Sequence, residues 1–297
     1  MKILQSTLYV SLFLFVAVML ATSPAAFCRA FIDGVTIWAV SVLPVLLPFA
    51  LLAPLAARAL PRKVSVTGFL FGVHADGLFL PSLICGYPVG AKLISMSDCD
   101  KDTATKLSSF CSTPGPIFVV ATVGPLLHDA RATAILAVSQ LVACVLCGVL
   151  NGRFHGGTTK ATTTSTADKN FGQSLTDAIL SVLSVGALIA LVYMFTSMVK
   201  SLFPSDVSES LVFNFALGLA EMTNGVFAIT SLCQNLSAAT TLCSALLAFG
   251  GAGVLLQSMS FLSAKGVKVA AYLWQKVTQA AIATIVSFLL CLILLRQ

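Results

Sequence analysis

Charged residues are scarce in this chain. Asp, Glu, Lys and Arg together make up 9% of its 297 residues, whereas hydrophobic residues make up 58%. A soluble domain needs a hydrated, charged surface, so this composition excludes a soluble enzyme and predicts an integral membrane protein. Long unbroken apolar runs do not fit the alternating pattern of a β-barrel, and we therefore expect an all-α polytopic membrane protein.

Sequence motifs of membrane enzymes and of ATP-driven pumps are missing as well. The chain contains no H-E-x-x-H, no G-x-S-x-G and no Walker sequence. We therefore expect no enzymatic activity. Any driving force would come from the solute itself or from a coupling ion, either sodium or a proton, and no other cofactor is predicted.

Nine cysteines and a net charge of +6 could indicate a metal site or nucleic acid binding. Most of the cysteines lie inside apolar segments as small hydrophobes, and the C-x-x-C pair Cys144 and Cys147 has no second pair or histidine cluster beside it. We predict no metal site. The basic residues are scattered through short loops, so we expect no nucleic acid among the partners.

Seven apolar stretches are long enough to cross a hydrocarbon core of roughly 30 Å. They cover residues 3–22, 35–57, 103–127, 130–151, 175–201, 238–262 and 269–294. The first stretch follows a lysine and precedes small residues. It fits either a cleaved signal peptide or a retained N-terminal transmembrane helix that acts as a signal anchor.

Two further apolar stretches, 68–97 and 209–236, are interrupted midway by helix-breaking clusters, and we expect each to form a re-entrant helical hairpin. The spans 103–127 and 238–262 are also interrupted, which predicts broken transmembrane helices. The residues that mark the hairpin tips and helix breaks are Gly86, Pro88, Gly90, Pro114, Gly115, Gly225, Gly250 and Gly251.

The interruptions are spaced alike in the two halves of the chain. Gly90 precedes Gly115 by 25 positions, and Gly225 precedes Gly250 by 25. We expect an N-terminal helix (1–33), a first gate-like repeat (34–151), a Thr-rich cytoplasmic linker (152–171) that is flexible, and a second gate-like repeat (172–297).

The positive-inside rule predicts the orientation of these segments. With the N-terminus in the cytoplasm, eleven basic residues fall inside and four outside. The eleven are Lys2, Arg58, Arg62, Lys63, Lys101, Lys106, Arg153, Lys160, Lys169, Lys265 and Lys268; the four are Arg29, Arg131, Lys200 and Arg296. The two hairpins then enter from opposite sides, so the repeats are inverted. Inverted repeats with paired broken helices are typical of secondary transporters.

Four segments at these interruptions resemble the sporulation integral membrane protein YlbJ family, which belongs with the nucleoside-recognition (Gate) domain proteins. They are SLICGYPVGAK (82–92), SFCSTPGP (109–116), GLAEMTNG (218–225) and FGGAGVLLQS (249–258). The resemblance covers about residues 35–294. It implies a fold similar to concentrative nucleoside transporters, with both tips and both breaks around one small solute. Some relatives in spore formers are thought to handle the anionic metabolite dipicolinic acid.

Broken helices leave unpaired backbone groups, which lipid does not tolerate, so the four interruptions should converge on a cavity. Helix N-termini that point into it favour an anionic solute. The predicted substrate-binding residues are Tyr87, Lys92, Thr113, Glu221, Asn224 and Gln257.

Each of these residues also has a structural interpretation. Lys92 is a solute ligand, or it caps the carbonyls of the first tip or neutralises Glu221. Glu221 is a proton, sodium or solute group, or it caps the amides of the second tip. The remaining four side chains form hydrogen bonds either with the solute or with backbone groups at the breaks; they are Tyr87, Thr113, Asn224 and Gln257. Lys276, inside the last span, is expected to pair or snorkel rather than bind solute.

The leading hypothesis is a multi-pass secondary transporter of the cell membrane for a small polar or anionic solute, nucleoside-like or a carboxylate such as dipicolinate, with a role in sporulation. Its partners would be the lipid bilayer and that solute, and the sequence leaves a homo-oligomer open. The alternative is a membrane assembly or signalling component that keeps the same fold and transports nothing.

Overall fold

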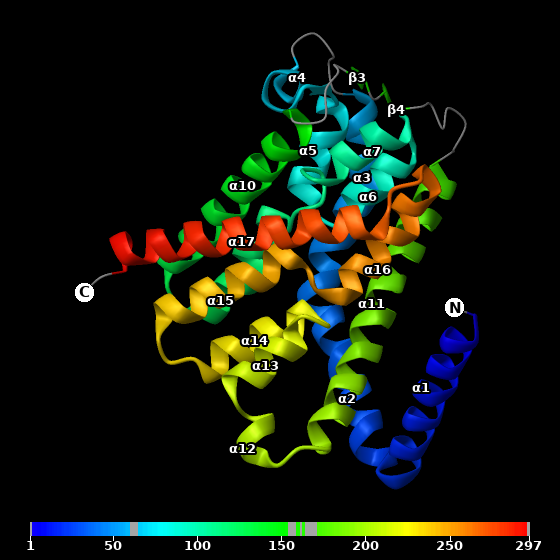
Figure 1. The fold of residues 1–297 in the computed structure, drawn as a ribbon, viewed down its shortest axis with the longest axis vertical. Helices are drawn as coiled ribbons and strands as arrows, with labels where there is room; N and C mark the ends of the chain where they lie inside the picture. The colour runs from blue at the N-terminus through cyan, green and yellow to red at the C-terminus, as the bar shows by residue number, and fades with distance from the viewer. Residues whose placement is uncertain (1, 60–64, 154–158, 161, 164–170, 296–297) are drawn as a thin grey trace.

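The computed structural model describes residues 2–59, 65–153, 159–160, 162–163 and 171–295, and almost all of them are helical (Figure 1). The helices before residue 154 are α1 (Lys2–Thr22), α2 (Pro24–Ile37), α3 (Leu43–Ala59), α4 (Val66–Phe71), α5 (Asp76–Cys85), α6 (Val89–Ser95), α7 (Lys101–Ser108), α8 (Pro116–Phe118), α9 (Gly124–Leu127) and α10 (Ala130–Arg153). Those after residue 170 are α11 (Phe171–Ser201), α12 (Ser205–Ser208), α13 (Leu211–Gly218), α14 (Met222–Leu232), α15 (Leu236–Phe249), α16 (Gly251–Leu262) and α17 (Val269–Leu294).

Five helical segments among the described residues are long and apolar enough to cross a membrane. They are Pro24–Ala53, Ala130–Gly152, Gly172–Ser201, Leu236–Lys265 and Val269–Leu294. The all-α, multi-pass prediction is therefore confirmed. The other two predicted crossings, 3–22 and 103–127, are not among these five; within the described residues their apolar helical stretches are Tyr9–Thr22, the later part of α1, and Pro116–Leu127.

α1 ends at Thr22, the end of the first predicted apolar stretch (3–22), and the structure has no break after residue 33, where the N-terminal helix (1–33) was predicted to end. Pro24 occupies the first turn of α2, where its missing N–H costs nothing, so the chain turns at Ser23 and starts a new helix. α2 then continues through a π-helical segment, η1 (Trp38–Val42), directly into α3. Residue 34 therefore lies inside a helical rod that begins at Pro24.

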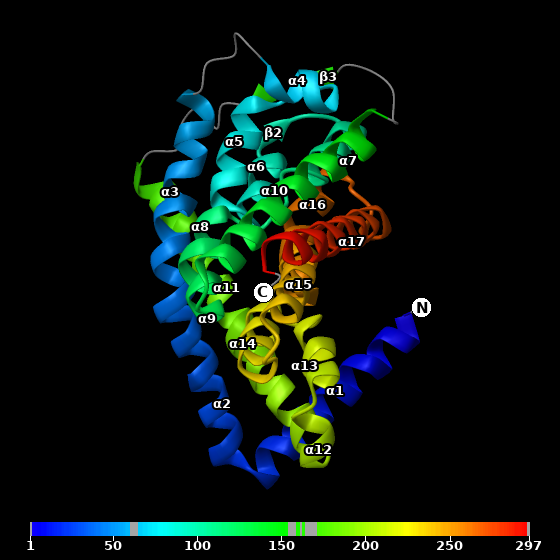
Figure 2. The ribbon, with the colours of Figure 1, turned by 90° about the vertical axis from the view of Figure 1, so that its left-hand side faces the viewer.

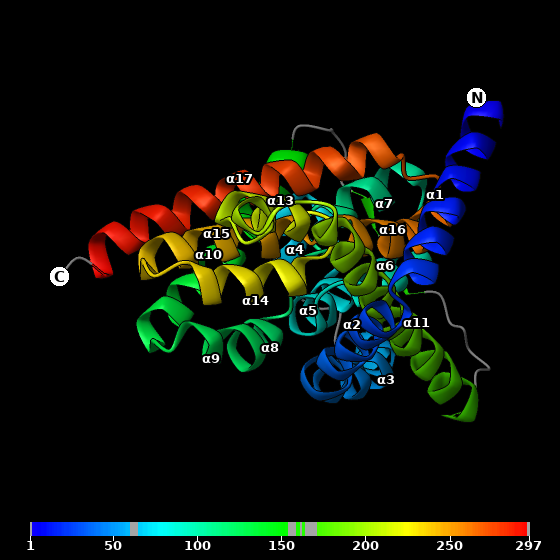
Figure 3. The ribbon, with the colours of Figure 1, turned by 90° about the horizontal axis from the view of Figure 1, so that it is seen from below.

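This rod and α11 form the long axis of the molecule and run in opposite directions (Figures 1 and 2). Small residues let them approach closely, since a Cβ on Gly34 would lie 2.8 Å from the Cα of Ala190. α17 runs across this axis and packs along α10 and α15, while α1 stands to one side (Figure 3).

Large apolar side chains cover much of the outer surface. Phe13 on α1 is 72% exposed, and Trp274 and Ile293 on α17 are 68% and 73% exposed. In water such surfaces would cost free energy, whereas lipid chains solvate them without penalty. The outer faces of these helices are therefore those of a protein in contact with a lipid bilayer.

The two predicted hairpins are present as pairs of short helices. α5 and α6 contain 10 and 7 residues and are joined at Gly86, and α13 and α14 contain 8 and 11 residues and are joined at Glu221. At 1.5 Å per residue, none of these helices is longer than about 17 Å, roughly half of a hydrocarbon core. They are too short to cross a bilayer singly.

The two predicted broken helices are present as well. α7 ends at Ser108, and a non-helical segment leads to α8, which continues through a second π-helical segment, η2 (Val119–Val123), into α9. In the second half a single residue, Gly250, separates α15 from α16. Its φ of +84° is a left-handed conformation that glycine adopts readily.

Parts of the Thr-rich segment form backbone pairs with the first half of the chain. β3 (Thr159–Lys160) pairs in parallel with β1 (Val73–His74), and β4 (Thr162–Thr163) pairs antiparallel with β2 (Ser97–Asp98). These four residues are therefore tied to the base of the first hairpin rather than free as expected. Arg62, Lys63, Lys169, Arg296 and most of the predicted linker lie outside the described residues.

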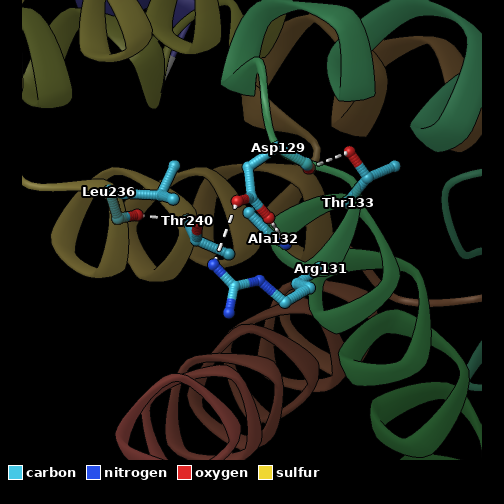
Figure 4. A network of polar contacts seen from close by, with 6 residues as sticks. All are labelled: Asp129, Arg131, Ala132, Thr133, Leu236 and Thr240. Carbon is cyan, nitrogen blue, oxygen red and sulfur yellow. Dashed lines mark hydrogen bonds and ion pairs between the residues drawn. The ribbon is translucent and has the colours of Figure 1, made fainter. Parts of the chain in front are cut away.

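The turn before α10 is fixed by Asp129. Its carboxylate accepts the N–H of Ala132 at 2.9 Å and lies 3.6 Å from the guanidinium of Arg131, while its carbonyl accepts the hydroxyl of Thr133 (Figure 4). The Ala132 N–H holds the pKa of the Asp129 carboxyl below its usual value. A carboxylate at a helix N-terminus also interacts favourably with the helix dipole, so this turn defines where α10 starts.

The arms of the second hairpin touch through two glycines. A Cβ on Gly225 would lie 2.4 Å from the Cα of Gly218, closer than any side chain allows. We predict that Gly225→Ala forces the arms apart, at a cost of about 1–3 kcal/mol, and lowers the Tm of the purified protein. Gly253→Ala is the matched control, because its nearest neighbour is the end of the Leu188 side chain at 3.3 Å rather than backbone. Equal Tm values for the two variants would contradict this packing.

Candidate functional site

The tip of the first hairpin is bonded to the first helix break through the main chain. The N–H of Tyr87 donates to the carbonyl of Thr113 at 2.9 Å. The approach is so close that a Cβ on Gly86 would lie 2.2 Å from the N of Gly115, and one on Gly90 would lie 1.7 Å from the carbonyl oxygen of Cys111. Glycines are needed here because two backbones touch without side chains between them.

The second hairpin tip is bonded to the second break in the same way. Ala252 N–H donates to the carbonyl of Leu219 at 2.8 Å, and Gly253 N–H donates to the carbonyl of Ala220 at 3.1 Å. The amides at the start of α16 therefore satisfy carbonyls at the end of α13. In each half of the chain, the hairpin tip and the helix break that follows it thus form hydrogen bonds with each other's unpaired backbone groups.

The two tip–break pairs meet each other at Tyr87. Its hydroxyl donates to the carbonyl of Leu247 at 3.0 Å and lies 2.7 Å from the sulfur of Met222, both in the second half of the chain. A cavity of about 70 Å³ lies beside this contact. It is lined by residues of both tips and both breaks, among them Tyr87, Pro88, Pro114, Gly115, Glu221 and Gly253.

The cavity is also flanked by the two π-helical segments. Val42, the last residue of η1, lines it, and Phe118, which precedes η2, lines it as well. The segments contact each other, because the hydroxyl of Thr122 in η2 donates to the carbonyl of Ser41 in η1 at 3.1 Å. A π-bulge frees a backbone carbonyl from the regular helical ladder, and such bulges are frequent at functional sites.

Three of the six predicted substrate-binding residues line this cavity, namely Tyr87, Glu221 and Gln257. Of the eight residues predicted to mark tips and breaks, Pro88, Pro114 and Gly115 line it too. The other five are glycines at which another part of the chain lies close to the Cα, which leaves little or no space for a side chain. They are Gly86, Gly90, Gly225, Gly250 and Gly251.

Glu221 acts as the N-cap of α14. Its two carboxylate oxygens accept the N–H groups of Thr223 at 3.0 Å and Asn224 at 2.7 Å. The side chain is 5% exposed and borders the cavity. Glu221 therefore caps the amides of the second tip, as its structural interpretation predicted. Its carboxylate also lies where a solute in the cavity could reach it.

Lys92 points away from the cavity. Its ammonium donates to the carbonyl of Asp177 at 3.0 Å and to the hydroxyl of Ser181 at 2.8 Å, both on α11. It therefore ties α6 to α11. None of its three predicted roles, as a solute ligand, a cap of the first tip's carbonyls or a partner of Glu221, corresponds to these two contacts.

Thr113 and Asn224 are close to the cavity in sequence but do not line it. Among the described residues, the hydroxyl of Thr113 and both polar atoms of the Asn224 amide are buried without a hydrogen-bond partner. Unsatisfied buried polar groups cost free energy, so each of these side chains has unused capacity to bind a ligand or water.

Lys276 is the residue whose position sequence reasoning missed. It lies on α17, 1% exposed, and its ammonium donates to the carbonyl of Ser112 in the first break and to the side-chain oxygen of Gln279, both at 2.7 Å. The ammonium also lies 5.3 Å from the centroid of the Tyr87 ring. Lys276 was expected to pair or to snorkel, and these contacts correspond to pairing, because the buried ammonium is hydrogen-bonded inside the protein rather than extended to the membrane surface.

Further buried polar contacts lie at the first break and between the long helices. The hydroxyls of Ser112 and Tyr272 are hydrogen-bonded at 2.5 Å, and the amide of Gln140 donates to the carbonyl of Ser244 at 3.0 Å. The first bond connects the first break with α17, and the second connects α10 with α15. A polar layer thus crosses the middle of an otherwise apolar protein, and in the described residues no carboxylate lies within 4 Å of Lys276.

Comparisons of the chain with protein-family models, with curated proteins and with solved structures gave no match.

We predict that the buried ammonium of Lys276 is not what holds the fold together. Lys276→Met keeps most of the side-chain volume and removes a desolvated charge, so the Tm of the purified protein should stay within a few degrees of the wild type. Lys276→Ala leaves a cavity in the same place and should lower the Tm clearly. A Met variant as unstable as the Ala variant would show that the ammonium itself is the main stabilising group.

Proposed function

We propose that this protein is a secondary carrier of a small polar solute, which binds in the cavity where the two hairpin tips and the two helix breaks meet. The observation that carries the proposal is the convergence of four interruptions, distant in sequence, on one cavity. Irregular backbone at membrane depth is tolerated where it is covered by protein or lines a cavity, and carriers commonly build their solute sites from such helix ends.

The order of elements gives a second argument. A long helix, a hairpin, a broken helix and a further long helix follow one another in residues 24–153, and again in residues 171–294. We interpret the two series as inverted repeats, as in concentrative nucleoside transporters, with the N-terminus in the cytoplasm of a cell-membrane protein. Alternating access would then be a movement of one set of elements against the other.

The lining of the cavity bears on the chemistry of the solute. Glu221 already occupies the N-terminus of α14, so a second anionic group is disfavoured at that helix end. Tyr87, Gln257 and the Glu221 carboxylate offer hydrogen bonds among apolar neighbours such as Val185 and Leu188. We therefore favour a solute that presents a neutral or donor group here, such as a nucleoside-like molecule, and an anion only if its charge lies elsewhere.

The four segments that resemble the YlbJ family all contribute residues to the lining of the cavity. On the basis of this resemblance we propose a role in sporulation.

The second candidate function, a non-transporting assembly or signalling component, is favoured by the small size of the cavity. A cavity of about 70 Å³ is below the roughly 300 Å³ of typical small-molecule sites. If the protein is a carrier, its cavity must therefore widen from this closed conformation before a solute can enter.

Ligand binding by the purified protein tests the proposal. A thermal-shift screen with nucleosides, dipicolinate and other small carboxylates should reveal a compound that raises the Tm, because ligands stabilise the state they bind. That compound should then show saturable, counterflow-competent uptake into proteoliposomes. No shift with any compound and no uptake would favour the non-transporting alternative.

Variants distinguish cavity residues from structural ones. We expect Gln257→Ala and Glu221→Gln to weaken binding of the screened compound by roughly five- to tenfold, the loss of about one hydrogen bond. Lys92→Met is the matched control, because Lys92 contacts α11 outside the cavity, and its Kd should stay at the wild-type value. A Lys92→Met variant that loses affinity while Gln257→Ala does not would contradict the site.

A further inference from the structure

A second and much larger hollow lies between α11 and the second hairpin. It has a volume of about 560 Å³ and is bordered by Tyr193, Thr196, Ser197 and Lys200 on α11, and by Asn224 and Ser231 on α14. Most of its lining side chains are polar. A hollow of this size and polarity is within the range of small-molecule sites, whereas an apolar gap between helices would be filled by lipid.

Two of its side chains have unused binding capacity. Both polar atoms of the Asn224 amide are buried without a hydrogen-bond partner in the described part of the chain. Lys200 is half-buried, and no described carboxylate lies within 4 Å of its ammonium. The other charged residue of the lining, Glu209, is exposed and forms no ion pair with Lys200.

The hollow and the central cavity lie in succession along the same three helical elements. On α11 the cavity ends at Ile189 and the hollow starts at Tyr193, one helical turn further. On α14 the cavity ends at Thr223 and the hollow starts at Asn224. The α2–η1 rod also borders both. The two spaces therefore follow one another along these helices.

We propose that this hollow is a water-filled vestibule that binds a small organic anion, with the anionic group at Lys200 and a hydrogen-bonding group at the Asn224 amide. Its role as the approach to the central cavity rests on the proposed carrier function, but its ability to attract anions does not. The Lys200 ammonium is the half-buried charge of the lining, and a positive charge that is partly shielded from bulk water attracts anions more strongly than one on an open surface.

Cysteine accessibility tests the vestibule without knowledge of the solute. Cys28, Cys85, Cys99 and Cys233, which are not fully buried, are first replaced by alanine. Ser197→Cys and Ser231→Cys are then introduced singly, and the protein in liposomes is treated with methanethiosulfonate reagents that carry either a sulfonate or a trimethylammonium group. Ser184→Cys, on a part of α11 that faces outward and does not border the hollow, is the matched control.

We expect both vestibule cysteines to react and Ser184→Cys to stay unmodified, because lipid excludes charged reagents. At Ser197→Cys the sulfonate reagent should react roughly tenfold faster, relative to free cysteine, than the cationic reagent. Lys200→Gln should remove this preference. Unreactive vestibule cysteines, or a preference for the anionic reagent that survives Lys200→Gln, would overturn the proposal.

The outcome is independent of the carrier proposal. If the vestibule cysteines react with anion selectivity but no screened solute is bound or transported, the carrier proposal fails and the anion site remains. Transport by a protein whose vestibule cysteines are inert would do the opposite.

Discussion

The structure depends on main-chain hydrogen bonds between interruptions that lie far apart in sequence. Tyr87 N–H to Thr113, and Ala252 N–H to Leu219, join each hairpin tip to the helix break that follows it. In lipid an unpaired amide or carbonyl costs several kcal/mol, so a chain that breaks a helix at membrane depth must supply a partner at the same depth. Pairing one break with another meets this requirement and brings the four sites to one place.

A consequence of this pairing is a polar centre inside an apolar protein. Lys276 holds the carbonyl of Ser112 and lies over the ring of Tyr87, whose hydroxyl reaches Leu247 in the other half. A movement of either tip would therefore disturb bonds in both halves at once. Insertion of a lysine at the centre of a membrane span costs about 3 kcal/mol, which favours a functional reason for its presence.

Much of the fold could be predicted because glycine and proline act locally. Helices are interrupted at the Gly- and Pro-rich clusters that contain Pro88, Gly115 and Gly250, so the hairpins and breaks were predicted at the right positions, whereas the single Pro81 lies inside α5. The direction of a side chain is not local: Lys92 is close to the first tip in sequence, yet the helix turns it towards α11. Lys276 lies in an uninterrupted apolar run, where only the packing of distant helices determines its partners. The π-helical segments gave no sequence signal that we could identify.

Photo-crosslinking from the first tip tests the central claim most directly. A benzophenone side chain that replaces Tyr87 would sit beside Met222 and Leu247, with which the native hydroxyl is in contact. After irradiation of the protein in liposomes, mass spectrometry of its peptides should find the crosslink in the segment that contains these two residues. Crosslinks to lipid alone, or to segments away from the second tip and α15, would show that the interruptions do not meet.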